Sequence, residues 1–116
     1  MYKVFCGDCA KVLTSIEADS VDLVVTSPPY DNLRDYHSEF DLDAITKELV
    51  RIVKDGGVIV WIVGDATIDG SETGTSFRQA LKFMDAGFNL HDTMIFEKNS
   101  STYPANEKSN RYTQIF

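Results

Sequence analysis

The feature that most constrains this chain is an apolar run, residues 21–26, that ends in the tetrapeptide Ser27-Pro28-Pro29-Tyr30. Four of its six residues are β-branched, and such a largely apolar run is typical of a strand buried on both faces of a parallel sheet. Each proline fixes its φ angle at about −65° and removes a backbone donor. The sequence therefore predicts a buried strand that ends in a stiff corner, where fixed carbonyl acceptors lie beside an aromatic ring.

Strand and helix patterns alternate along the whole chain. Besides the run at 21–26, short apolar runs predict strands at residues 2–5, 58–63, 91–97 and 112–116. This alternation predicts an α/β fold, a three-layer sheet with right-handed crossovers.

Helical spacing of apolar residues predicts helices at residues 10–16, 41–54 and 75–86. The second helix should stop at Asp55-Gly56-Gly57, and the third should begin with a cap at Ser76 or Thr75. The third helix should also bury one apolar stripe: Phe77, Ala80, Leu81 and Met84. Residues 27–40 and 67–75 are predicted to be loops, the second because it is rich in Gly, Ser and Thr.

Length, hydropathy and charge limit the cellular setting and the partners that are expected for this chain. With 116 residues the chain is one domain or part of one, and no apolar stretch or signal-like N-terminus suggests a membrane or export, so a soluble, cytoplasmic protein is expected. The formal charge of −7 argues against a broad phosphate-binding surface. Three basic residues near the end, Lys98, Lys108 and Arg111, are too scattered to change this expectation.

Cys6 and Cys9 have the Cys-x-x-Cys spacing that can mark a redox or zinc site. A structural zinc site needs four ligands, and neither His37 nor His91 has a paired spacing that would complete one. We therefore expect two reduced thiols and no metal.

The chemically distinctive residues follow the predicted strands. Asp8 follows the first, Ser27 to Tyr30 follow the second, and Asp65 follows the third. Ligands of open α/β sheets bind beyond the carboxyl ends of the strands, so this edge is the predicted site. Asp is also common in turns and caps, and Asp65 in particular has this plainer interpretation.

Four segments together resemble the DNA N4-cytosine/N6-adenine methyltransferases, in the subgroup whose catalytic motif precedes the cofactor motif. They are Val4-Phe5-Cys6-Gly7-Asp8, the run from residue 21 to Tyr30, Lys54-Asp55-Gly56-Gly57-Val58-Ile59-Val60, and residues 87–98. The likeness covers nearly the whole chain and implies a Rossmann-like methyltransferase fold with S-adenosyl-L-methionine as cofactor. The main alternative for the double proline is that it only ends a strand.

The resemblance also implies roles for single residues. An exocyclic amino nitrogen is a poor nucleophile, because its lone pair is delocalised into the base, and acceptors for its hydrogens counter this. Ser27 Oγ and the Pro28 carbonyl, held by Pro29, would be these acceptors, and Tyr30 would stack on the flipped base. Asp8 would accept a hydrogen bond from the amino group of the cofactor's adenine.

The target base and the state of the fragment have alternatives. Serine at the first motif position favours cytosine N4, since relatives with aspartate there mostly modify adenine N6, which is the alternative target. No Gly-x-Gly occurs in the 116 residues, so the glycine-rich cofactor loop is expected to be missing from this partial domain, residues 1–116. The chain also leaves no room for a target-recognition region, which is expected to be missing too. Double-stranded DNA would be gripped largely by other regions.

This gap has a structural consequence. In the family the strands that go with the glycine-rich loop lie between the Asp8 strand and the strand at 21–26. Their absence leaves apolar edges, so we expect a homo-oligomer or dependence on a complementing half. The alternative outside enzymology is a truncated, non-catalytic binding or assembly fragment.

Overall fold

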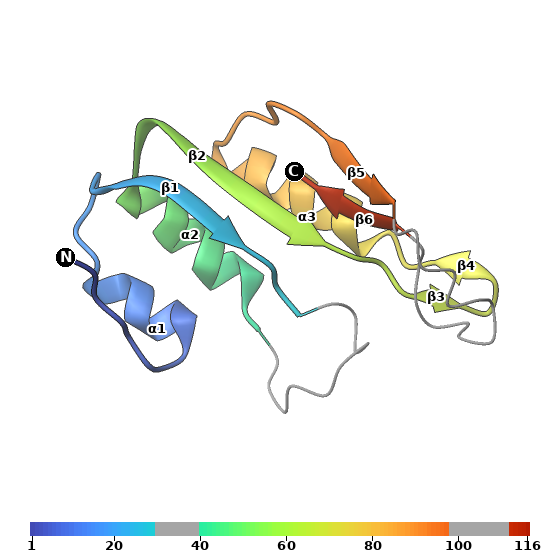
Figure 1. The fold of residues 1–116 in the computed structure, drawn as a ribbon, viewed down its shortest axis with the longest axis horizontal. Coiled ribbons are helices and arrows are strands. Elements are labelled where there is room, and N and C mark those ends of the chain that lie inside the picture. The colour runs from blue at the N-terminus through green and yellow to red at the C-terminus, as the bar shows by residue number, and fades with distance from the viewer. Residues whose placement is uncertain (30–39, 98–111) are drawn as a thin grey trace.

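The computed structural model describes residues 1–29, 40–97 and 112–116, and its centre is a mixed sheet. The strands, in spatial order, are β1 (Val21–Thr26), β2 (Val53–Val63), β6 (Tyr112–Ile115) and β5 (Met94–Glu97) (Figure 1). β1 and β2 are parallel, and β6 is antiparallel to both of its neighbours. The predicted α/β class is confirmed, as an incomplete sheet with flanking helices, although β5 starts three residues later than expected.

The helices cover one face of this sheet. They are α1 (Cys9–Val12), which continues as the 3-10 turn η1 (Leu13–Ser15), α2 (Leu42–Ile52) and α3 (Thr75–Ala86). Figure 1 shows α2 and α3 behind the strands. Arg51 of α2 donates a hydrogen bond of 2.9 Å to the Leu13 carbonyl, which ties η1 to the same layer. Among the described residues, no helix lies over the opposite face.

The hydrophobic core lies between the sheet and the helices. Its buried residues are Ile45, Leu49, Ile52, Val53, Trp61, Val63 and Phe83. The Trp61 ring meets Phe83 edge-on with 4.8 Å between ring centres. The Trp61 Nε1–H donates to Gln79 Oε1 at 2.8 Å, so the one polar atom of this buried indole is satisfied.

α2 begins as predicted and ends earlier. The Asp41 carboxylate accepts from the Ala44 N–H at 3.1 Å, a standard N-cap contact. The predicted stop at residues 55–57 was wrong, because Val53 already pairs with Val21 and begins β2. The glycines instead form an irregular segment inside β2, where the register shifts between Val21 and Leu23. An added Cβ on Gly57 would lie 2.6 Å from Val53 Cγ1 and 2.9 Å from the Lys54 carbonyl, so this segment needs glycine.

The strand predicted at residues 2–5 was wrong. These residues form no strand, and Tyr2 and Val4 are 88% and 84% exposed. A β-type sequence becomes a strand only where a neighbouring strand satisfies its backbone groups. Within the described part of the chain, no strand accompanies this segment.

The loop predicted at residues 67–75 contains a small hairpin, so that prediction was wrong. β3 (Thr67–Ile68) pairs with β4 (Ser71–Glu72) across the turn Asp69-Gly70. Both turn residues have positive φ, 49° at Asp69 and 77° at Gly70. Positive φ at both central positions is the type I′ geometry, and Asp-Gly is among its preferred sequences.

α3 has the predicted length but a different buried face. Ala80 is buried as expected, together with Ser76, Gln79 and Phe83. The predicted inward residues Phe77, Leu81 and Met84 are exposed. The exposed residues and the buried residues both repeat at helical spacing, so periodicity alone predicts two possible buried stripes. The stripe that is buried contains Gln79, whose amide oxygen accepts the hydrogen bond from Trp61. Gly74, with φ of 68°, occupies the cap position predicted for Ser76 or Thr75.

Candidate active site

The predicted catalytic loop leaves the sheet at the end of β1. Its first residue, Ser27, is exposed, whereas Pro28 is buried and Pro29 is half-buried. A buried proline followed by a second proline fixes the backbone of the corner with little freedom to relax. The loop therefore presents the serine at the surface on an anchored backbone. Tyr30 lies outside the described residues.

The end of β2 lies beside this corner. Thr26 pairs with Trp61 in the parallel ladder, so both strands finish at the same edge of the sheet. Gly64 and Asp65, which follow β2, are both buried. The predicted meeting of two strand ends is therefore present.

Asp65 has a structural task at this edge. Its side chain is completely buried, and its two oxygens accept from the backbone N–H and the hydroxyl of Ser76, each at 2.7 Å. Ser76 is in the first turn of α3, where N–H groups lack helical partners and negative charge is favoured. Asp65 thus caps α3 from eleven residues away and joins the helix to the end of β2.

Sequence reasoning missed this pairing. It treated Asp65 as a plain turn residue and looked for the α3 cap within the helix itself. The signal that could have found it is the Asp69-Gly70 turn, since a hairpin there folds residues 67–72 back on themselves. The Thr73 N–H then donates to the Ala66 carbonyl at 2.9 Å, which brings the start of α3 back to Asp65.

Asp8 lies just before α1 and acts as its N-cap. One carboxylate oxygen accepts from the Ala10 N–H at 3.0 Å. The side chain is exposed, and within the described ranges the second oxygen makes no hydrogen bond. An outward carboxylate oxygen can accept a hydrogen bond from a ligand's amino group.

Cys6 lies just before α1, and Cys9 is the first residue of this helix. Cys6 and Cys9 are exposed and form no disulfide. In the described part of the chain, no group of three or more His, Cys, Asp or Glu side chains is placed to hold a metal ion.

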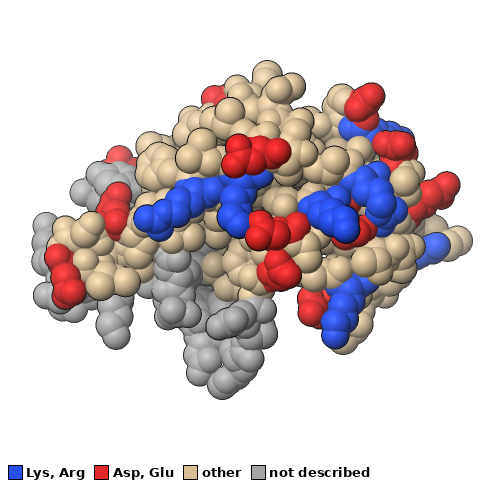
Figure 2. All heavy atoms as spheres, turned by 180° about the vertical axis from the view of Figure 1, so that it is seen from behind, with Lys and Arg blue, Asp and Glu red and all other residues tan. Residues whose placement is uncertain are grey.

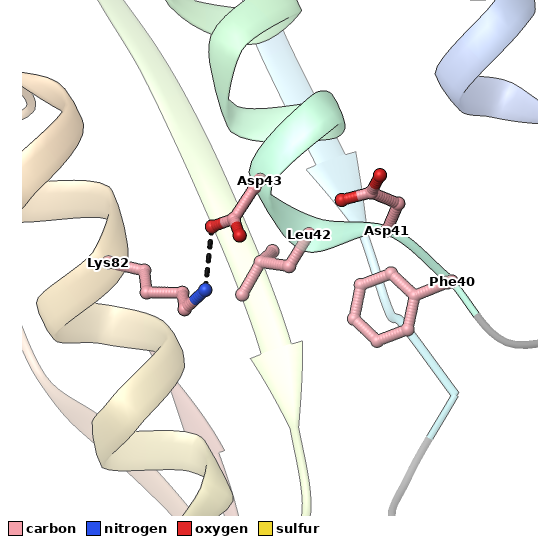
Figure 3. A pocket seen from close by; sticks show the side chains of 5 residues that line it. All are labelled: Phe40, Asp41, Leu42, Asp43 and Lys82. Atoms are coloured by element: carbon pink, nitrogen blue, oxygen red, sulfur yellow. Dashed lines mark hydrogen bonds and ion pairs between the residues drawn. The ribbon is translucent and has the colours of Figure 1, made fainter.

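A hollow of about 550 Å³ lies near the start of α2 (Figure 3). It is lined by Phe40, Asp41, Leu42, Asp43 and Lys82. Lys82 Nζ is 2.6 Å from Asp43 Oδ1, so its charge is already paired. Of the predicted site residues that the structure describes, none lines this hollow, and its two carboxylates do not suit a phosphate.

The helix-covered face carries no basic patch among the residues that the structure describes. Figure 2 shows Lys and Arg side chains interleaved with Asp and Glu across this face. Arg51 pairs with Glu48 at 2.7 Å, and Lys54, at the start of β2, pairs with Asp22 of β1 at 2.9 Å. Paired charges do not offer a phosphate-binding surface. Lys98, Lys108 and Arg111 lie outside the described residues.

Comparison with known proteins decides the family. The family model of N6/N4-type DNA methylases matches residues 21–116. The chain belongs to this DNA methylase family. The resemblance predicted from the Ser-Pro-Pro-Tyr motif and its surroundings is thereby confirmed.

The curated relatives of this chain are methyltransferases. The orphan methyltransferase M.BamHII from Bacillus amyloliquefaciens is 58% identical over 111 residues, which are 95% of this chain and 37% of M.BamHII. The type II methyltransferase M.SmaI from Serratia marcescens is 32% identical over 84 residues, which are 61% of this chain and 29% of M.SmaI. The chain therefore spans 37% of M.BamHII, and its match covers 29% of M.SmaI.

Solved structures confirm the methyltransferase fold. TTHA0409 from Thermus thermophilus, described as a putative DNA modification methylase and crystallised with S-adenosyl-L-methionine, superposes with a TM-score of 0.71 at 26% identity. The match covers 94% of this chain and 51% of TTHA0409. The cytosine-N4-specific PvuII DNA methyltransferase shares the fold at 21% identity, with a TM-score of 0.70, covering 96% of this chain and 46% of that one. S-adenosyl-L-methionine, the cofactor expected from the resemblance, is thus bound in a structural relative of this chain.

The longest described helix, α3, has 12 residues, and none of the described helices is long and apolar enough to cross a membrane.

Proposed function

We propose that this chain carries the catalytic loop of a site-specific DNA methyltransferase that modifies the N4 amino group of a flipped cytosine. The observation that supports this most is the corner after β1, where Ser27 is exposed and Pro28 is buried at the carboxyl edge of the sheet. An anchored backbone that presents a serine at the surface suits this reaction, because the target nitrogen must be held in one orientation.

The proposed chemistry at this corner is hydrogen bonding to the target amino group. Ser27 Oγ and the Pro28 carbonyl accept from its two hydrogens, which draws the lone pair out of conjugation with the base. The nitrogen is then held for in-line attack, without a covalent intermediate on the enzyme. Tyr30 stacks on the flipped base.

Asp8 fits part of a cofactor site. Its carboxylate is exposed, and the oxygen that does not cap α1 is available to accept from the adenine amino group of S-adenosyl-L-methionine. The bound cofactor supplies an electrophilic methyl group on sulfur. A Gly-x-Gly motif does not occur in the 116 residues, so the rest of the proposed cofactor site belongs to another segment or chain.

The proposed DNA partner is gripped mainly outside these residues. The chain carries a net charge of −7, and its described basic side chains on the helix-covered face lie among acidic ones. Neutralising phosphates needs clustered Lys and Arg. We place the reaction in the cytoplasm, as for a restriction-modification methyltransferase.

A complementing half is the proposed partner for the open face of the sheet. Leu23, Val25 and Val58 lie on this face and are 57%, 60% and 52% exposed. Exposed apolar side chains on neighbouring strands favour a covering layer. The remainder of a longer methyltransferase, or a separate chain equivalent to it, fits this need.

The test is a chimera in which this chain replaces the matching segment of M.BamHII, its 58% identical relative. We expect the chimera to methylate duplex DNA and Ser27→Ala to reduce the rate by about 100-fold or more, because one of two acceptors is lost. Ser71→Ala, on the exposed hairpin strand β4, is the matched control and should leave the rate unchanged. Undiminished methylation by Ser27→Ala and Tyr30→Ala would falsify the proposed mechanism.

Nucleoside analysis of the chimera's product separates the two target bases. N4-methylcytosine is expected, and N6-methyladenine would move the assignment to the alternative. Titration of the 116-residue chain with labelled S-adenosyl-L-methionine addresses the non-catalytic alternative, since binding by this chain alone would count against a silent assembly fragment.

A further inference from the structure

The outer flank of α3 carries an exposed apolar stripe. Phe77, Leu81 and Met84 are 54%, 57% and 44% exposed, and at about 100° per residue they lie on one flank of the helix. The opposite flank faces α2, because Lys82 pairs there with Asp43. The stripe therefore points away from α2, toward the β6 and β5 side of the molecule.

The stripe continues onto the sheet. Phe77 and Phe116 meet edge-on with 6.5 Å between ring centres. Ile95 of β5 is 64% exposed and pairs with Gln114, which in turn pairs with the core residue Val63. Residues paired across strands share a face, so Ile95 lies on the helix-covered side at the β5 edge. Helix α3, strand β5 and the residue after β6 thus contribute to one apolar surface, the α3 flank: Phe77, Leu81, Met84, Ile95 and Phe116.

Charged residues border the stripe in a self-complementary order. Arg78 and Asp85 are exposed and seven residues apart, almost two helical turns, so they lie in line along the same border. Arg78 donates from one guanidinium nitrogen to the Thr73 carbonyl at 2.9 Å, which leaves further donors on its fork. Among the described residues, none forms an ion pair with the Asp85 carboxylate.

An antiparallel copy of the same helix satisfies this pattern. If two α3 helices meet at a two-fold axis through Leu81, each Phe77 faces Met84 of the other copy. Each Arg78 then faces Asp85 of the other copy. A two-fold interface requires this reciprocity, because both copies use the same surface.

We propose that the α3 flank is an interface with a second copy of this chain. Apolar contact at Leu81 forms its centre, and the two Arg78–Asp85 pairs at its border set the antiparallel direction. Three half-exposed side chains alone are a small area, and Ile95 and Phe116 extend it onto the sheet. This proposal is independent of the proposed reaction, since the α3 flank contains neither Ser27 nor Asp8.

Sedimentation or light scattering of the purified chain measures the association. We expect a dimer, with Arg78→Asp or Asp85→Arg each weakening it about tenfold or more, because either change places like charges opposite each other twice. The double variant Arg78→Asp/Asp85→Arg restores opposite charges and should recover the dimer. A monomeric chain overturns the proposal, and so does association that ignores both single reversals.

Disulfide trapping distinguishes the α3 flank from the open sheet face. In a Cys6→Ser/Cys9→Ser background, Leu81→Cys should cross-link to itself on mild oxidation, because the axis passes through this position. Val25→Cys, which is 60% exposed on the open face, is the matched control. Cross-linking at position 25 in preference to position 81 assigns the association to the sheet face and rejects the α3 interface.

Discussion

The two faces of the sheet have similar apolar sequences and opposite environments. On the covered face, Trp61 and Val63 of β2 are 4% and 1% exposed beneath the helices. On the open face, Leu23, Val25 and Val58 are each more than half exposed. The strands therefore present apolar side chains on both sides, and the described helices pack against one of them.

This difference shows what a continuous apolar run does and does not establish. The run at residues 21–26 indicates that both faces are built to be covered. It does not say which segment covers each face. The helices between the strands supply one layer. This chain spans 37% of M.BamHII, so a relative of that length has further residues from which a second layer can be built.

The largest effect is expected from the covered face. Ile52→Ala removes a side chain that is 2% exposed and leaves a cavity between α2 and the sheet. We expect the free energy of unfolding to fall by about 2–5 kcal/mol. Urea unfolding followed by circular dichroism measures it. Val50→Ala, on the same helix but 44% exposed, should cost clearly less, and equal costs would mean that this core is not packed.

The second-largest loss of stability is expected at Asp65, which caps α3 and joins this helix to the end of β2. Asp65→Ala removes two buried hydrogen bonds to Ser76, one of them to the backbone at the start of α3. We expect a loss of about 2–3 kcal/mol, larger than the roughly 1 kcal/mol for Asp41→Ala at the exposed cap of α2. Parallel urea titrations of the two variants give the comparison. If the order is reversed, Asp65 does not anchor α3.

The sequence predicted those parts of the fold that local patterns decide. The run at residues 21–26, the start of the helix near Asp41 and the extent of α3 need only propensity and periodicity, and the structure contains all three. The strand at residues 2–5 failed because a strand needs a partner. The prediction of the inward face of α3 failed because two stripes of the helix have the same period. The buried stripe makes long-range contacts, such as Trp61–Gln79, that the local sequence does not reveal.

At the candidate site, too, the sequence predicted what local patterns decide and missed a long-range contact. The position of Ser27 at the end of a strand followed from the run before it. The Asp65–Ser76 pair did not, since it joins residues eleven apart across a hairpin. The roles of Ser27, Pro28, Pro29, Tyr30 and Asp8 stay predictions.

A smaller effect is expected where β1 and β2 join. Gly57→Ala places a methyl group 2.6 Å from Val53 Cγ1 and 3.2 Å from the Asp22 carbonyl, so the irregular segment must shift. We expect a loss of about 1–3 kcal/mol in unfolding free energy, typical of overpacking. Gly70→Ala, with φ of 77° and no atom within 4 Å of the new Cβ, tests backbone strain alone and should cost about 1 kcal/mol. A similar cost at both positions would show that the contact with Val53 relaxes freely.

The smallest effect, and the sharpest test of the comparison, is expected on the open face. Val25→Thr keeps the β-branched shape and replaces a methyl by a hydroxyl on a side chain that is 60% exposed. In the 116-residue chain the unfolding free energy should change by about 0.5 kcal/mol or less, because the hydroxyl stays in water. In the chimera with M.BamHII the same change should cost about 1–3 kcal/mol, since a covering layer buries the hydroxyl without a partner. Urea unfolding of both proteins supplies the two values, with Val63→Thr on the covered face as the control that is costly in each. An equal, small cost of Val25→Thr in both proteins would mean that this face of the sheet stays open even when the rest of a methyltransferase is present.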